Sequence, residues 1–237
     1  YYAAGVLKYV RANDADGTTW GTPITVQSGG VGQYTSLAVV DGNPAISYFH
    51  SGVGLKYVRA TNVNGTTWGT PAAVDSASGA GQYTSLVVVN GNPAISYYDS
   101  STGDLRYVRA NDTAGSTWGT PVTVDSANTV GQYTSLAVVN GNPAISYYHL
   151  SLQDLKYVRA SDASGTTWGA PVTLDSTGNV GLYTSLAVVN GNPAIRYADN
   201  TANGQIKYVR STDTSGTAWG TPVVVDYVFQ NREGGTL

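Results

Sequence analysis

Cysteine and methionine are absent from this sequence of 237 residues, and glutamate occurs once, as Glu233. The lack of cysteine excludes disulfide bonds and thiolate metal sites, and it leaves the redox compartment open. Charged residues make up only 11% of the chain, about half the usual share. Glycine (29 residues) and tyrosine (18 residues) are abundant instead. This composition is typical of short strands joined by tight turns, and the apolar content is ample for a core.

The sequence also lacks an excess of basic residues and a long apolar run. The formal net charge of −3 predicts no nucleic-acid partner and no attraction to an acidic membrane surface. No stretch approaches the roughly 18 apolar residues of a membrane span, so we expect no membrane insertion. The chain begins at Tyr1 without a methionine or a signal peptide, and we interpret it as processed, trimmed or part of something larger.

What the sequence does contain is one unit of about 50 residues, repeated five times. Tryptophans spaced 48, 50, 50 and 51 residues apart mark the units: Trp20, Trp68, Trp118, Trp168 and Trp219. A fixed period of this size predicts a solenoid, a propeller or an array, in which each unit covers its apolar face with its neighbours. We therefore predict a single domain over residues 1–226.

Each unit contains four strand-like runs, for example residues 105–110, 117–124, 134–139 and 144–148. Asn140-Gly141 supplies the residues that tolerate a positive φ in a hairpin turn between the last two runs. Pro121 places the run 117–124 at a sheet edge. Four consecutive antiparallel strands per unit are typical of a propeller blade. The predicted fold is all-β, a β-propeller of four-stranded antiparallel blades.

The two ends of the chain leave one blade incomplete. Tyr1-Tyr2 aligns with the end of a second strand, and residues 226–237 align in length with residues 125–136, so one inner hairpin is missing. We predict five blades, one of them incomplete or closed by strands from both termini. A window on a longer repeat protein and completion by a strand of another chain are the alternatives. Residues 227–237 depart from the repeat and are predicted to form a tail or linker.

A turn with an acidic residue precedes the tryptophan of each unit. The pattern is Tyr-Val-Arg-x-x-Asp-x-x-Gly-x-Thr-Trp, as in residues 157–168, with Asn62 in place of the aspartate in the second unit. It resembles the Asp-box repeat of bacterial sialidases and related secreted propellers, Ser-x-Asp-x-Gly-x-Thr-Trp, although the acid lies six places before the tryptophan rather than five. In that family the Asp box is a folding element remote from the catalytic centre. We expect the aspartate to cap backbone N–H groups and the glycine to be left-handed.

The chemistry that the sialidase resemblance implies is not matched. That family uses a triad of arginines, a tyrosine nucleophile paired with glutamate, and an aspartate acid. The single glutamate lies in the divergent tail. One arginine recurs at the same position in each of the five units: Arg11, Arg59, Arg109, Arg159 and Arg210. This regularity favours pairing with nearby aspartates or stacking on aromatic rings. No unique pair of acids suits a general glycosidase. We predict that the chain is not an enzyme and uses no cofactor.

The candidate ligand-binding residues come from two segments of the unit that are expected to share one face. The loop after the second strand varies most and contributes His50, Tyr98, Asp99, Tyr148, His149 and Asp199. The start of the first strand contributes Gln33, Gln82 and Gln132, near the predicted tunnel mouth. We predict a ligand rim suited to sugars, with solvated loops as the alternative. Equivalent positions on different blades are too far apart to share one ion, so no metal is predicted.

These observations predict a bacterial, secreted or cell-surface module that binds without catalysis. It would be lectin-like, recognising glycans or a surface protein through several similar blade sites and gaining from multivalency. The alternatives are a structural repeat segment of a large surface, adhesin or sheath assembly, and a sialidase-type glycoside hydrolase. Self-association through the incomplete blade is a further expectation.

Overall fold

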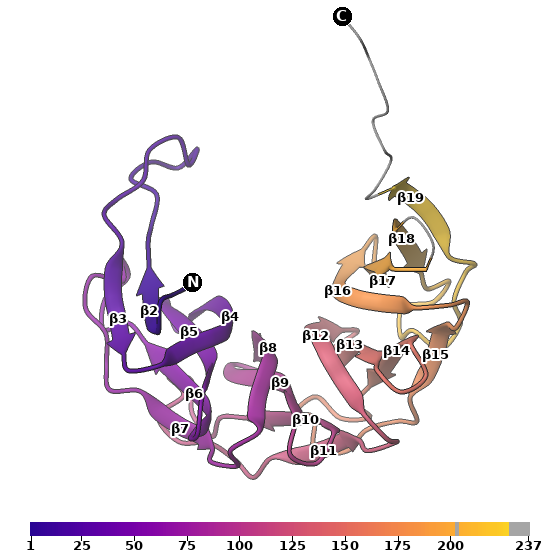
Figure 1. Cartoon of the computed structure of the whole chain (residues 1–237), viewed down its shortest axis with the longest axis horizontal. Helices are drawn as coiled ribbons and strands as arrows, with labels where there is room; N and C mark the ends of the chain where they lie inside the picture. The colour runs from indigo at the N-terminus through magenta and orange to yellow at the C-terminus, as the bar shows by residue number, and fades with distance from the viewer. Residues whose placement is uncertain (202–203, 228–237) are drawn as a thin grey trace, which may run out of the picture.

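The computed structural model describes residues 1–201 and 204–227, which fold into five antiparallel sheets placed along an arc (Figure 1). The described residues contain strands, turns and bends but no helix, and therefore no helix that could cross a membrane. Each sheet is built from strands that are consecutive in the chain. The predicted all-β architecture of propeller blades is confirmed.

The first sheet contains β1 (Tyr2–Ala3), β2 (Val6–Tyr9) and β3 (Ile24–Ser28). The second contains β4 (Val31–Val40), β5 (Asn43–His50), β6 (Gly54–Arg59) and β7 (Ala72–Asp75). The third contains β8 (Ala80–Val89), β9 (Asn92–Asp99), β10 (Asp104–Arg109) and β11 (Val122–Asp125). The fourth contains β12 (Val130–Val139), β13 (Asn142–His149), β14 (Asp154–Arg159) and β15 (Val172–Asp175). The fifth contains β16 (Val180–Val189), β17 (Asn192–Asp199), β18 (Gln205–Arg210) and β19 (Val223–Tyr227).

One blade is incomplete, as predicted. The first sheet has three strands, and its β1 is only two residues long, whereas the other sheets have four strands each. Strands β4, β8, β12 and β16 line the inner side of the arc, and the first and fifth sheets stand at its two ends (Figure 1). In the described part of the chain β19 pairs with β18, while β1, β2 and β3 pair with one another. The predicted tail 227–237 begins inside β19, and residues 228–237 lie outside the described residues.

The hairpin turns and the edge strands follow from local sequence. Asn140 and Gly141 both have a positive φ, of 45° and 81°, as a tight hairpin turn requires. The run expected over 117–124 is divided: Trp118 forms an isolated bridge to Ala110, and β11 begins only after Pro121. The strand after the proline is the outer edge of its sheet, as predicted.

The core lies between neighbouring sheets. In one of four such clusters, Leu105 and Tyr107 of the third sheet pack against Leu136 and Tyr147 of the fourth. Each fully buried Leu or Ile side chain of this kind contributes roughly 1.5–3 kcal/mol. Trp168 closes the cluster by an edge-on contact with Tyr107, with ring centroids 5.1 Å apart. The tryptophan therefore covers the gap to the preceding blade.

The repeated arginines hold the hairpin turns. Arg109 donates from Nε to the Val89 carbonyl (2.8 Å) and from Nη2 to the Asn90 carbonyl (2.6 Å). Arg159 makes the same two contacts one blade further on. Pairing with a nearby aspartate, which the sequence favoured, occurs at Arg59, whose Nη2 lies 3.2 Å from Asp41. The guanidinium thus satisfies carbonyl groups that a tight turn leaves free.

Candidate functional site

A row of tyrosines lies on the four inner strands, one from each of the second to fifth sheets: Tyr34, Tyr83, Tyr133 and Tyr183. All four have a φ of 52° or 53°, which is unusual for a residue with a bulky side chain. Each lies at a register shift of its strand, for example between Gln132 and Ser135 in β12. The bulge removes the tyrosine from regular pairing and re-aims its side chain.

The tyrosine rings form a continuous aromatic surface across the blades. Neighbouring ring centroids are 4.6, 4.5 and 4.4 Å apart along the row, with the ring planes tilted by 49° to 55°. The four tyrosines and the threonines that follow them line a hollow of about 280 Å³. Burial raises the pKa of Tyr83 above its usual value, so the phenol stays neutral at physiological pH. We call this feature the axial tyrosine row.

Contacts between blades hold the backbone carbonyls of three of these tyrosines, Tyr34, Tyr83 and Tyr133. The Thr184 hydroxyl donates to the Tyr133 carbonyl of the preceding blade (2.9 Å) and lies 2.8 Å from the Ser146 hydroxyl. The Leu186 amide donates to the Ser135 hydroxyl of the preceding blade (2.9 Å). Equivalent bonds join the other inner strands. Strain of about 1–3 kcal/mol per residue persists only where surrounding contacts fix it, and it is concentrated at functional sites.

The predicted aromatic and amide residues lie beside the row. Tyr98 is 6.3 Å from Tyr83 between ring centroids, and Tyr148 is 6.1 Å from Tyr133. Gln82 and Gln132 are the cross-strand partners of these outer tyrosines, and Gln33 has the same position opposite Phe49. Gln82 donates to the Ser100 hydroxyl (2.9 Å). The structure therefore brings five of the nine predicted residues together around the axial tyrosine row: Gln33, Gln82, Tyr98, Gln132 and Tyr148.

The four loop residues are held by their own loops or blades. His149 is buried, with Nε2 2.9 Å from the Ala127 carbonyl and Nδ1 accepting the Leu152 amide at 2.9 Å. His50 is half-buried and contacts the Ser51 carbonyl. Asp99 and Asp199 are buried and accept the amides two residues on, at 3.0 and 2.8 Å. A ligand-binding role for these four residues stays a prediction.

Buried carboxylates lie beside the sheet boundaries and pair with cations. In the fifth sheet, Lys207 Nζ lies 2.7 Å from Asp199 and 3.2 Å from Asp175 of the fourth sheet. The Tyr197 hydroxyl donates to Asp175 at 2.6 Å. Burial raises the pKa of Asp199, but hydrogen bonds from Lys207 and Thr201 outweigh it and leave the pKa lowered. Both charges are therefore present at neutral pH.

The equivalent pair between the second and third sheets uses arginine. Arg106 Nε lies 3.4 Å from Asp99, and Nη1 lies 3.8 Å from Asp75, which also accepts the Tyr97 hydroxyl at 2.7 Å. The Arg106–Asp99 contact is an ion pair without hydrogen-bond geometry. The recurrence of this arrangement in different blades indicates a contribution to blade packing.

The fifth sheet departs from the repeat at the end of the row. Arg196 occupies the position that is a serine in the other blades, for example Ser146 in the fourth sheet. Arg196 donates to the Tyr183 carbonyl (3.2 Å). Leu182 and Ala198 replace the glutamine and tyrosine of the other blades. These residues, with Tyr183 and Asp199, line a cavity of about 360 Å³. Here a guanidinium and a carboxylate lie next to the axial tyrosine row.

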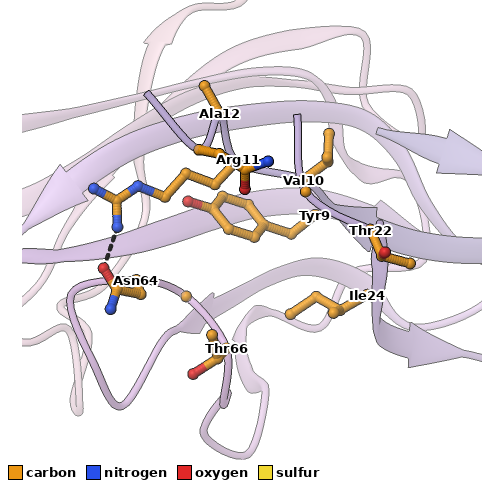
Figure 2. A pocket seen from close by; sticks show the side chains of 11 residues that line it. Tyr9, Val10, Arg11, Ala12, Thr22, Ile24, Asn64 and Thr66 are labelled. Carbon is orange, nitrogen blue, oxygen red and sulfur yellow. Dashed lines mark hydrogen bonds between the residues drawn. The ribbon is translucent and has the colours of Figure 1, made fainter. Parts of the chain in front are cut away.

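A larger pocket of about 470 Å³ lies where the first and second sheets meet (Figure 2). Figure 2 shows Arg11 reaching across it to Asn64, with the Tyr9 ring next to the Arg11 side chain in this view. The same groove, of about 370 Å³, recurs between the second and third sheets around Tyr57 and Arg59. This recurrence marks it as a feature of the blade interface. Among the described residues, no group of three or more His, Cys, Asp or Glu is placed to hold a metal ion.

Comparison with known proteins places the fold. No family model matches the chain, and no curated protein sequence matches it. Solved structures do match. The GH43 endo-arabinanase from Bacillus licheniformis has a TM-score of 0.57 and 14% identity, over 83% of this chain and 80% of that chain. An α-L-arabinofuranosidase from Clostridium thermocellum has a TM-score of 0.56 and 13% identity, over 84% and 72%. The Bacillus subtilis arabinanase has a TM-score of 0.55 and 12% identity, over 83% and 81%.

These structures share the fold of this chain, and they are five-bladed β-propellers of the GH43 glycoside hydrolases rather than sialidases. The expectation of a binding module that is not an enzyme is therefore contradicted, because the similar propellers are enzymes. That expectation rested on two observations: the catalytic residues of sialidases are not matched, and the repeated sequence offers no unique pair of acids. At 12–14% identity the likeness shows the fold, and no catalytic residue is carried over from it.

Sequence reasoning missed the axial tyrosine row as a unit. It named the glutamines at the start of the inner strands but not the tyrosine that follows each of them. The available signal was the triplet Tyr-Thr-Ser, present in four units at a predicted strand start. The left-handed φ could not be foreseen, because it accompanies a register shift in the pairing of the inner strand and involves a tyrosine, a residue type that rarely has a positive φ.

Proposed function

We propose that this chain is a glycoside hydrolase that acts on a polysaccharide, with sugar rings lying against the axial tyrosine row. The observation that carries the proposal is the row itself, which is continuous across four blades and open to a hollow of about 280 Å³. Aromatic faces beside a few fixed polar groups are typical of ligand sites. The likeness to glycoside hydrolase structures supports the reaction class. A secreted or cell-surface location belongs to the same proposal.

Hydrolysis of a glycosidic bond generally uses two carboxyl groups, of which one is ionised as nucleophile or base. Asp199 lines the cavity next to Tyr183, and Asp175 shares the Lys207 ammonium with it. The lowered pKa of Asp199 suits the ionised partner. We therefore assign Asp199 as the carboxylate to test first. Against the effect of burial, hydrogen bonds from Thr177, Tyr197 and Lys207 lower the pKa of Asp175 too, so Asp175 holds Lys207 and is not assigned as the general acid.

The test is the release of reducing ends from arabinan and xylan by the full chain. The wild type is expected to release them, and Asp199→Asn is expected to lower kcat by about 100-fold or more. Asp41→Asn is the matched control, since Asp41 is an exposed carboxylate paired with Arg59 at a hairpin turn. No release by the wild type from either polymer or from a fluorogenic sialoside would refute the proposal.

The tyrosine row is tested separately through Tyr133, which has ring neighbours on both sides. Tyr133→Ala is expected to raise KM about tenfold with little change in kcat, because the row binds ground state and transition state alike. Val138→Ala, an exposed apolar truncation at the other end of the same strand β12, is the control. A change in kcat with KM unaltered would contradict the assignment of the row to substrate binding.

A further inference from the structure

The contact that joins neighbouring blades is present four times, and one half of a fifth contact stands at each end of the arc. In every joint, the tyrosine of one sheet meets the tryptophan of the next, with ring centroids 5.0 to 5.2 Å apart. The pairs are Tyr9–Trp68, Tyr57–Trp118, Tyr107–Trp168 and Tyr157–Trp219. Two positions of this series are left over, Trp20 in the first sheet and Tyr208 in the fifth.

The glycine in the turn before each tryptophan shows the same series. A methyl group placed on Gly65, Gly115, Gly165 or Gly216 would lie 2.6 to 2.7 Å from a carbon of the tyrosine ring of the preceding sheet. A methyl group on Gly17 would have no atom within 4 Å. The turn that ends at Trp20 therefore has the seat for a tyrosine ring, and the seat is open.

The apolar side chains around these two positions are uncovered as well. Trp20 is 60% exposed, whereas the other four tryptophans are half-buried. Val189 of the fifth sheet is 38% exposed, whereas its equivalent Val139 is fully buried by the next sheet. Val225, at the position of Leu174, is 65% exposed. We call Tyr208, Val189 and Val225 the donor face, and Gly17 with Trp20 the receiving face.

We propose that the donor face of one molecule docks on the receiving face of a second copy of this chain, end to end, and repeats the outer part of the contact between blades, where the tyrosine meets the tryptophan. The two faces belong to the sheets at opposite ends of an open arc, so they meet between molecules without any change at the four packed joints (Figure 1). The occupant is fixed by continuity with an interface that the chain already makes four times. Such a head-to-tail contact is heterologous, so it forms rings or open chains.

A polar contact supports the same register. Asn140 in the hairpin turn of the fourth sheet donates to the Ser215 hydroxyl of the fifth (3.1 Å). The equivalent positions at the open ends are Asn190 and Asp16. An asparagine amide donates well to a carboxylate, so Asp16 strengthens the docked arrangement.

The first test is the sedimentation of the full chain at increasing concentration. We expect the wild type to associate, and Trp20→Ala to lower the association constant about tenfold, as the loss of an aromatic pair and its buried area implies. Leu152→Ala, equally exposed but in the middle of the arc, is expected to leave the constant unchanged. A wild type that stays monomeric at every concentration, or a Trp20→Ala chain that associates as well as the wild type, would overturn the proposal.

The second test uses the absence of native cysteine. Chains with Asp16→Cys and with Asn190→Cys are mixed and oxidised, and the expected product is a disulfide dimer with one chain of each kind. A chain with both Asn140→Cys and Ser215→Cys is the positive control, because these side chains meet inside one molecule. A chain with both Asp16→Cys and Asn190→Cys that closes as a monomer would show that the faces meet within one molecule, which contradicts docking between copies.

Discussion

Two kinds of residue set the local structure of the repeat, and both act by holding backbone groups. The aspartate of each turn before a tryptophan accepts several amides, as Asp112 does from Ser116 and Thr117, both at 2.9 Å. Asn62 holds the same turn with its carbonyl oxygen, accepting the Thr66 amide at 3.2 Å. At the axis, the Thr184 hydroxyl fixes the carbonyl of a left-handed tyrosine. The caps lie within one turn, whereas the carbonyls of Tyr34, Tyr83 and Tyr133 are held by the next blade.

The turn aspartates are expected to make stability depend on pH in the acid range. The backbone amides of Ser116 and Thr117 lower the pKa of Asp112 to about 2, from about 3.9 in an unfolded chain. A lowered folded pKa gives stability above the unfolded pKa that is lost as the pH falls through the folded one, here from about 4 to about 2. Asp112→Asn should reduce this loss by less than about 1 kcal/mol, since the turn is exposed.

Urea unfolding at pH 7 and pH 2.5 measures this effect. The reciprocal change, Asn62→Asp, adds a titrating group to the same turn and is expected to steepen the dependence. If the free energy of unfolding falls by the same amount between pH 7 and pH 2.5 in the wild type, Asp112→Asn and Asn62→Asp, protonation of these turns is not linked to folding.

At the scale of strands and sheets, the joint between blades is the unit of stability. Tyr107 packs edge-on to Trp168 and donates from its hydroxyl to the Ser164 carbonyl (3.1 Å), so one side chain secures both ring and turn of the next blade. Gly165 is required there twice, by its φ of 74° and by the ring above it. A side chain at Gly165 should therefore weaken the contact between the third and fourth sheets and leave the strand pairing within each sheet unchanged.

Gly165→Ala is expected to destabilise the chain by about 2 kcal/mol more than Gly17→Ala does. The two glycines share a positive φ, of 74° and 67°, so the backbone cost cancels and the difference isolates the clash with the Tyr107 ring. Both are compared by urea unfolding at a protein concentration where the wild type is monomeric. Equal losses for the two variants would mean that the ring does not occupy the seat.

Sequence patterns predicted the elements well, and the site only in part. Period and turn residues gave the four strands, the Asn140-Gly141 turn and the edge position after Pro121, because these depend on local backbone preference. They also gave Gln132 and Tyr148 as neighbours of the site. They did not give the aromatic row, because its spacing comes from the stacking of separate sheets. The predicted function was wrong for a related reason, since a repeated sequence does not reveal which of its acids lie together, and the comparison was made with another family.

At the scale of the whole molecule, the arc is a series of nearest-neighbour contacts with two different ends. Among the described residues the first sheet has no inner hairpin, and Leu37 of β4 is 58% exposed where its equivalent Leu86 is 3% exposed. The fifth sheet exposes the donor face. The middle sheets are covered on both sides. The free energy of local unfolding should therefore be largest for the central sheet and smaller for the sheets toward both ends.

Hydrogen exchange is expected to follow this gradient. Amides of β8 and β9 in the third, central sheet should exchange most slowly, and those of β2 and β18 at least about tenfold faster, measured by mass spectrometry on the monomer. Trp20→Ala should leave the order unchanged in the monomer, because its seat is empty there. Uniform protection of all five sheets would instead indicate a single cooperative unit.

In each of the first four sheets, the tyrosine packs against the tryptophan of the next sheet along the chain. The contact is the same whichever two sheets are neighbours. An in-frame duplication or deletion of one 50-residue unit would therefore keep a tyrosine–tryptophan contact at every joint, whereas contacts specific to one joint, such as Lys207–Asp175, would change. Unequal recombination between such similar copies is then harmless to folding, so the number of blades can change in a single genetic event. The number of blades can therefore change without the evolution of a new kind of contact between them.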